Sequence, residues 1–178
     1  MKNDESLRFP TGRFAPKDAY AFEELQAFID RIEALPARLR SATESLTQEQ
    51  LDTPYRDGGW TLRQVIHHLA DSHTNAYTRL KWSLTESTPT IKAYDEKGWA
   101  ETPETKADPE VSLRMVEALH ARWVMLLRAL RPEDFEKGYI HPDTGKFVSL
   151  GHQVALYAWH GEHHLAHLGL VAPHVQPT

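Results

Sequence analysis

Histidines are the unusual feature of this sequence, and most of them lie in two short segments. The chain has 178 residues, of which 11 are histidine and none is cysteine. Residues 67–73 read HHLADSH, and residues 160–167 read HGEHHLAH. On a helix, a spacing of four residues places two imidazoles on one face, where both can bind the same metal ion. The second segment contains two such pairs, His160 with His164 and His163 with His167.

A helical wheel distinguishes between these two pairs. At about 100° per residue, the His160/His164 pair lies roughly 70° from the apolar centre of its helix, whereas the His163/His167 pair lies roughly 130° from it. The first pair is therefore expected to border the core, and the second pair to point more to water.

The same wheel selects one histidine from the first segment. His68 lies roughly 100° from the apolar centre of its helix, and His67 lies roughly 150° from it. The strip that contains His68 also carries three polar residues, which predicts the wall of a polar cavity: Ser72, Asn75 and Arg79. We therefore expect His68, His160 and His164 to bind one divalent metal ion per chain.

The remaining histidines are expected to have other roles. A single histidine beside a core more often satisfies a hydrogen bond than binds a metal, and that alternative also applies to the three expected ligands. A set drawn from two helices, with one pair four residues apart, favours the metal. Structural or supporting roles are expected for His73, His120 and His152, and surface positions for His141 and His174.

Three histidines and no cysteine predict an open metal site. Structural zinc sites usually have four protein ligands, whereas catalytic sites keep a position for water or substrate. Neutral imidazoles also leave the charge of the ion uncompensated. Such a site can lower the pKa of bound water to about 7, or bind a thiolate.

The segment around the second histidine pair does not match a zinc peptidase. Those enzymes have the motif H-E-x-x-H, in which a general-base glutamate follows the first ligand directly. Here Gly161 follows His160, and Glu162 comes one residue later, where the wheel points it away from the ligand pair. No other carboxylate is obviously placed as a base, which argues against a peptidase but not against water activation in general.

Composition excludes several other classes of protein. Lys and Arg total 20 and Asp and Glu total 25, so the net charge is −5, which argues against a nucleic-acid partner. Without cysteine, a disulfide scaffold, a thiolate zinc site, an iron–sulfur cluster and a cysteine nucleophile are excluded. No apolar run is long enough to span a membrane, and the N-terminus does not resemble a signal peptide. We expect a cytoplasmic protein.

The pattern of apolar residues predicts an all-α protein with a single domain over residues 1–178. Residues 1–17 are expected to form an extended arm, and Pro36 to kink or break the first helix, which resumes over 37–46. Residues 87–108 form a long loop, and residues 139–148 a hairpin or loop. Trp60 and Trp123 are expected to be core residues. The long helices are predicted over residues 18–35, 61–86, 109–130 and 149–171. Helix bundles place metal sites between facing helices.

Several of these segments together resemble the DinB/YfiT-like superfamily, and within it the YfiT subgroup. In that family a Trp is followed eight residues later by the first histidine ligand, and later by H-x-x-x-H. Trp60, His68 and the pair His160/His164 match this motif. The resemblance extends over nearly the whole chain through residues 55–61, 65–73, 90–97, 118–123 and 157–164.

The resemblance implies a four-helix bundle of up-down-down-up type with a three-histidine site for zinc or nickel, and commonly a homodimer. Members of the YfiT subgroup are described as metal-dependent hydrolases. Related proteins are S-transferases that use a low-molecular-weight thiol such as bacillithiol.

Three functions therefore stay open, two of them enzymatic. In the first, a bound thiolate attacks a small electrophile such as an epoxide or an alkyl halide. In the second, metal-bound hydroxide attacks an ester or amide. In the third, the protein is a metal-binding stress module without turnover. The open site favours chemistry. The family resemblance and the lack of a general base beside His160 favour the thiol slightly, and the absence of cysteine is compatible with it.

Overall fold

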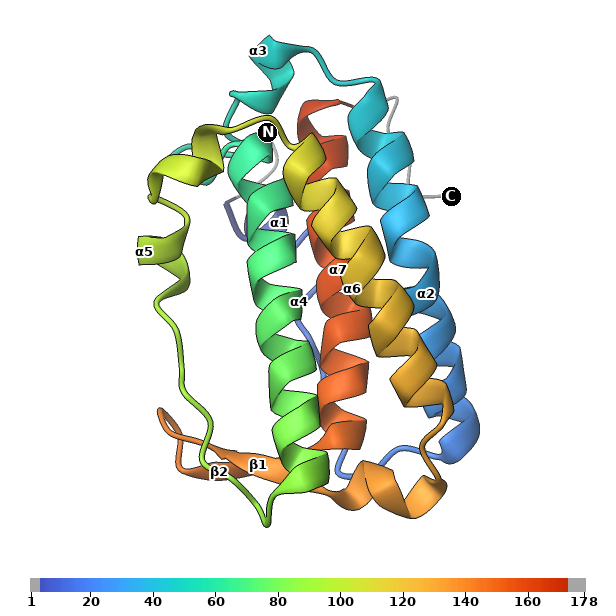
Figure 1. Cartoon of the computed structure of the whole chain (residues 1–178). Helices are drawn as coiled ribbons and strands as arrows, with labels where there is room; N and C mark the ends of the chain where they lie inside the picture. The colour runs from blue at the N-terminus through green and yellow to red at the C-terminus, as the bar shows by residue number, and fades with distance from the viewer. Residues whose placement is uncertain (1–3, 173–178) are drawn as a thin grey trace.

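Four long helices form a bundle in the computed structural model, which describes residues 4–172 (Figure 1). Helix α2 packs against both α6 and α7, and α4 packs against the same two helices. In Figure 1, α2 and α7 run upward while α4 and α6 run downward. This confirms the expected four-helix bundle of up-down-down-up type. The bounds are Phe22–Glu44 for α2, Leu62–Thr85 for α4, Glu110–Arg128 for α6 and Leu150–Val171 for α7.

Because α4 and α6 run in the same direction, the chain between them must return along the length of the bundle. This crossover is the long loop predicted from the sequence, and it contains α5 (Glu96–Trp99) and the 3-10 helix η1 (Pro103–Lys106). Three residues of the crossover itself are buried: Ile91, Ala100 and Thr105. The crossover therefore covers one side of α4 as a packed layer (Figure 1).

Short polar residues determine where the helices begin. Thr61 precedes α4, and its side-chain oxygen accepts a hydrogen bond from the Gln64 amide while the Gln64 side chain bonds back to the Thr61 amide. Ser149 precedes α7 and accepts from the His152 amide. Such caps satisfy backbone N–H groups that have no partner inside the helix. They fix the start of α4 and α7, the two helices that carry the expected ligands.

Pro36 does not break the first long helix, so the expected break with a restart at residue 37 is wrong. Helix α2 continues from Phe22 to Glu44 with Pro36 inside it. Proline has no N–H to donate to the carbonyl four residues earlier, which belongs to Ile32. His120 of α6 fills that role, because its Nδ1 lies 2.7 Å from the Ile32 oxygen. The neighbouring helix therefore satisfies the carbonyl that proline leaves without a partner.

The smaller elements close the two ends of the bundle. The expected hairpin is present as β1 (Gly138–His141) and β2 (Lys146–Ser149), which pair antiparallel. The arm was expected to be extended throughout, but it contains a short helix, α1 (Asp4–Arg8). The other short elements are α3 (Gln48–Leu51) and the 3-10 helix η2 (Pro132–Glu136).

The apolar core has two parts, and a layer of histidines lies between them. One part packs around Leu39, Leu69 and Leu165, and the other around Ile29, Leu80 and Trp123. On three of the long helices, the residues between the two parts include buried or half-buried histidines: His73 on α4, His120 on α6, and His160 and His164 on α7. The bundle is therefore polar at mid-height.

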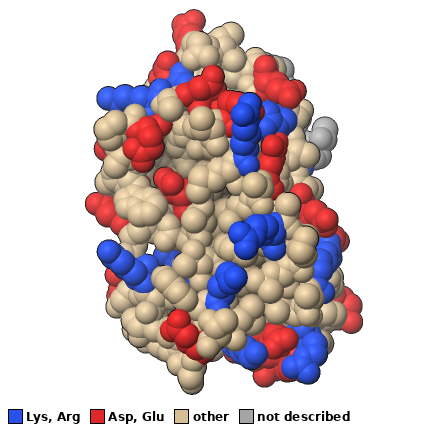
Figure 2. Space-filling view, viewed as in Figure 1, with Lys and Arg blue, Asp and Glu red and all other residues tan. Residues whose placement is uncertain are grey.

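Charged residues of both signs are mixed over the surface shown in Figure 2, with no continuous basic area. Among residues 4–172, no helix has both the length and the apolar character needed to cross a membrane.

Trp123 is the largest side chain in the core and is fully buried. Replacing a buried aromatic residue with alanine leaves a cavity and costs about 3–5 kcal/mol. We therefore expect Trp123→Ala to lower the free energy of unfolding by about this amount in urea titrations. Met125→Ala, on the same helix but 73% exposed, is the control and should unfold like the wild type. Equal stability of the two variants would contradict the role of Trp123 in the core.

Candidate metal centre

The three expected ligands lie together at mid-height in the bundle. His68 extends from α4, and His160 and His164 extend from α7. The His160 Nε2 lies 3.3 Å from the His68 Nε2 and 3.2 Å from the His164 Nε2, and one nitrogen from each ring lies within 4.8 Å of the others. Two nitrogens bound to one zinc ion at about 2.0–2.1 Å and a tetrahedral angle would be about 3.3 Å apart. The donor set therefore fits a divalent metal ion, and its occupancy stays a prediction.

Burial keeps all three rings neutral. It lowers the pKa of His68 to about 4, and it lowers those of His160 and His164 well below the usual value. Neighbouring histidines add to each shift, because their positive charges would repel another proton. A neutral imidazole has one N–H and one free lone pair. Which nitrogen carries the lone pair then decides whether a ring can bind a metal.

A chain of hydrogen bonds fixes this choice for His160. The Ile32 carbonyl can only accept, so the His120 Nδ1 donates to it. The His120 Nε2 then accepts from the His73 Nδ1 at 2.8 Å, and the His73 Nε2 accepts from the His160 Nδ1 at 3.1 Å. Because burial lowers the pKa of His73 and His120 and keeps both rings neutral, each ring has one proton to give. The His160 Nε2 is left with a free lone pair facing the site.

A shorter chain does the same for His164. The His167 Nε2 donates to the carbonyl of Arg8 at 3.3 Å, so the His167 Nδ1 accepts from the His164 Nδ1, also at 3.3 Å. The His164 Nε2 therefore carries the lone pair that faces the other ligands. Both candidate ligands on α7 thus donate their other N–H to a second histidine. Histidines that bind a metal usually donate this N–H to a partner that fixes the ring, most often a carboxylate, a backbone carbonyl or water.

His163, His164 and His167 form a second group with metal-ligand spacing. The His163 Nδ1 is buried and has no hydrogen-bond partner. One neutral imidazole can offer only one lone pair, however, and the His164 lone pair is directed to the first group. The two groups cannot both bind a metal ion through neutral His164, and the hydrogen bonds favour His68, His160 and His164.

The expectation that His163 and His167 point more to water is wrong. Both are buried, because the N-terminal arm and the loop before α4 cover that face of α7. Phe9 lies against His163, with ring centroids 5.8 Å apart, and Tyr55 stacks on His167 at 4.0 Å. A helical wheel places a residue relative to the bundle core and contains no information about segments that fold over the outside.

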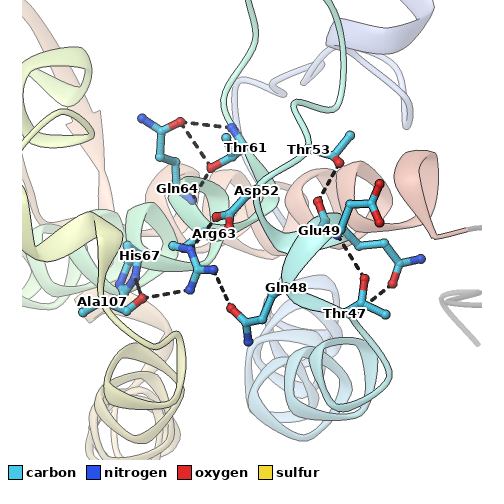
Figure 3. A network of polar contacts seen from close by, with 11 residues as sticks. Thr47, Gln48, Glu49, Asp52, Thr53, Thr61, Arg63, Gln64, His67 and Ala107 are labelled. Atoms are coloured by element: carbon cyan, nitrogen blue, oxygen red, sulfur yellow. Dashed lines mark hydrogen bonds and ion pairs between the residues drawn. The ribbon is translucent and has the colours of Figure 1, made fainter.

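His67, the residue that the wheel placed farthest from the core, is also buried. Its Nε2 donates to the carbonyl of Ala107 at 3.2 Å, and its Nδ1 accepts from the Ser112 hydroxyl at 2.7 Å. Arg63 donates to the same carbonyl and also contacts Asp52 (Figure 3). His67 therefore joins α4 to the end of the crossover and points away from the site.

The other histidines have varied surroundings. His73 and His120 lie behind His160, as described above. His152 is half-buried against Phe14. His141 was expected at the surface but is half-buried, with its Nδ1 4.0 Å from the Asp143 carboxylate, and His174 lies outside the described residues.

The three-histidine group opens into a pocket of about 580 Å³. Trp60 forms part of its wall and lies over His68, with ring centroids 4.7 Å apart. It is only half-buried and packs against the apolar core from outside, so it lies at the edge of the core and not within it as expected. Glu96 and Glu101, from the crossover, also line the pocket. Neither glutamate could be predicted from the sequence, because a loop has no periodicity that shows which way a side chain points. Glu162 faces away and forms an ion pair with Arg38 of α2.

Comparison with known proteins agrees with this architecture. A family model described as the DinB superfamily matches residues 31–168. The YfiT protein of Bacillus subtilis strain 168 is 49% identical over 164 residues, which are 92% of this chain and 92% of that protein. A protein of Bacillus cereus strain AH820 is 53% identical over 162 residues, which are 91% of this chain and 93% of that protein. Both are named as metal-dependent hydrolases, and both names mark that activity as provisional.

A solved structure of YfiT from Bacillus subtilis has the same fold. It superimposes with a TM-score of 0.92 at 48% identity and covers 95% of this chain and 97% of that one. It is described as a probable metal-dependent hydrolase with an unusual four-helix bundle topology.

Removal of any one proposed ligand should release the metal. We expect His68→Ala, His160→Ala and His164→Ala each to lose most of the bound metal, because each variant keeps only two of three donors. His67→Ala is the matched control and should retain it, since both ring nitrogens of His67 are bonded elsewhere. Metal content by elemental analysis after dialysis measures the difference. Retention in His160→Ala, with loss in His163→Ala, would assign the ion to the second group.

The histidines behind the ligands should affect metal affinity without supplying a donor. His73→Phe keeps a ring of similar size but cannot accept from the His160 Nδ1. Loss of such an outer partner typically weakens metal binding about 10–100-fold. Competition with a chromophoric chelator measures the affinity, and His152→Phe, on α7 but outside the hydrogen-bonded chain, is the control. An unchanged affinity in His73→Phe would show that the chain does not orient His160.

Proposed function

This chain belongs to the DinB superfamily, and on that premise we propose that it is a metal-dependent enzyme that transfers a low-molecular-weight thiol to a small electrophile. The observation that carries the proposal is an open group of three neutral histidines facing a pocket of about 580 Å³. Zinc or nickel suits imidazole ligands. Bound there, the cation would supply positive charge that lowers the pKa of a thiol or a water molecule.

The residues around the site support nucleophilic attack by a thiolate. His68, His160 and His164 have only histidines as ring hydrogen-bond partners among the described residues, so no carboxylate is bonded to them. Without a nearby carboxylate, either nucleophile would depend on the cation alone to lose its proton, and a thiol, with a free pKa of about 8.5, needs a smaller shift than water, with a pKa of about 15.7. The sulfur forms a bond to the electrophilic carbon, the leaving group departs with its electron pair, and the thiol proton passes to solvent.

The space around His160 also suits two substrates. His160 lines the pocket of about 580 Å³ and a second pocket of about 450 Å³. Glu96 and Lys97 of the crossover line both pockets as well. A thiol and an electrophile could therefore approach the same centre from different sides, with the crossover beside both.

Hydrolysis is the second candidate, and the names of the relatives favour it. In that case the most suitable bases are the two carboxylates that line the larger pocket, Glu96 and Glu101. Glu101 already accepts a hydrogen bond from the Gln64 amide group, which leaves Glu96 as the freer group. The thiol partner, a homodimer and a cytoplasmic location stay predictions from the sequence.

The nucleophile distinguishes the two enzymes. We expect turnover of an alkyl halide by the metal-loaded protein to require added bacillithiol, to saturate with its concentration and to give a product that contains the sulfur. Mass spectrometry of the products checks this. His68→Ala should be inactive because it lacks a ligand, and His67→Ala should be active. Hydrolysis of an ester at full rate without thiol, with labelled oxygen from the solvent in the product, would establish the hydrolase instead.

A further inference from the structure

Arg79 and His160 both line the second pocket. This pocket has a volume of about 450 Å³ and is lined by Arg79, His160, Ser72 and Tyr157 among others. Arg79 follows His68 by eleven residues, which is about three helical turns on α4. Helical side chains lean toward the helix N-terminus, so the guanidinium is directed back toward the metal site.

The charge of Arg79 has no partner of opposite sign. The side chain is buried, with only 8% of the residue exposed. Within residues 4–172 no carboxylate lies within ion-pair distance of it, and its Nε has no hydrogen-bond partner. Arg63, which is equally buried, differs because it forms an ion pair with Asp52.

The polar groups nearest to Arg79 cannot neutralise it. They include the phenols of Tyr139 and Tyr157. Burial raises the pKa of Tyr139 to about 12 and raises that of Tyr157 as well, so both remain neutral at pH 7. The carboxylates that line this pocket, Asp95, Glu96 and Asp143, are all exposed. Water screens them strongly, whereas a buried charge is screened much less.

An unpaired buried charge destabilises a folded protein, so Arg79 requires an explanation. The pocket around it contains further donors. Ser72 and Tyr157 place hydroxyl groups 3.5 Å apart, whereas the His141 Nδ1 faces the Asp143 carboxylate at 4.0 Å. A buried guanidinium with neutral hydroxyl groups in the same pocket, and with carboxylates only at its exposed positions, is suited to an oxyanion, which it can bind with two parallel hydrogen bonds.

We propose that Arg79 binds an acidic group of the substrate, a carboxylate or a phosphate, while the rest of the molecule extends past Tyr157 to His160. The class of substrate is then a small anionic molecule whose reacting atom lies some distance from its acidic group. Its role as a substrate rests on the function proposed above, whereas binding of the anion does not.

Binding can be measured without turnover. Succinate and inorganic phosphate, at matched ionic strength, should each raise the melting temperature of the metal-loaded protein in a concentration-dependent way, because a ligand that binds only the folded state stabilises it. Succinamide, which has the same length as succinate but no charge, should not. The comparison of succinate with phosphate shows which oxyanion the pocket prefers.

Substitutions then assign the binding to Arg79. Arg79→Met should abolish the anion-dependent shift, and Arg79→Lys, which keeps the charge but loses the two-pronged geometry, should weaken binding about tenfold or more. Arg122→Gln, an exposed arginine outside the pocket, should bind like the wild type. Because Arg79→Met also removes an unpaired buried charge, its melting temperature without anion should exceed that of the wild type.

Three results would overturn the proposal. The first is the absence of an anion-dependent shift in the wild type, which would mean that the pocket binds no anion. The second is an equal shift in Arg79→Met, which would mean an adventitious ion only. The third is a lower melting temperature of anion-free Arg79→Met, which would make Arg79 a structural residue. The same titrations on His68→Ala separate this proposal from the previous one. A shift that persists without the metal supports Arg79 even if no enzymatic activity is found, and a shift that disappears assigns the anion to the metal ion.

Discussion

Neutral imidazoles buried at the centre of a helix bundle impose the constraint on which the rest of this structure depends. Each neutral ring has one donor and one acceptor, and a buried donor without a partner is costly. The ligands on α7 meet this requirement by donating to further histidines, and those chains end at backbone carbonyls of Ile32 and Arg8. The ends of the chains leave the free lone pairs of His160 and His164 at one point. Hydrogen bonds that extend across the bundle therefore decide which nitrogens of the candidate metal site keep a free lone pair.

Pro36 lies one turn after Ile32 in α2 and leaves the Ile32 carbonyl without its helical partner. In an uninterrupted helix that carbonyl would also accept from the amide of residue 36, and His120 would have to share it. A residue that normally weakens a helix thus leaves the final acceptor of the chain to His120 alone.

Gly161 contributes in another way. A Cβ at this position would come within 2.7 Å of the Leu35 side chain, so glycine permits the close approach of α7 to α2 next to His160.

The parts of the fold that follow helical periodicity could be predicted from the sequence, and the parts formed by covering segments could not. The apolar stripes located three of the long helices to within a few residues, and the wheel brought His68 to the same interior face as His160 and His164. It placed His163 and His167 in water, however, because the arm that covers them is fixed by tertiary contacts with Phe9 and Tyr55. Glu96 could not be predicted either, because it lies in the crossover, which has no helical periodicity over its length.

Stability and function make opposite demands at this site. The two apolar parts of the core stabilise the bundle, and the layer between them interrupts the apolar packing with imidazole rings. Arg79, a buried arginine without a counter-ion, adds to this cost. A purely apolar layer would bury the same volume at lower cost. The interruption spans all four helices, because α2 provides a carbonyl, α6 provides His120, and α4 and α7 provide the ligands. Each helix must therefore be in register before the ligands can converge, which makes assembly of the site a consequence of complete folding of the bundle.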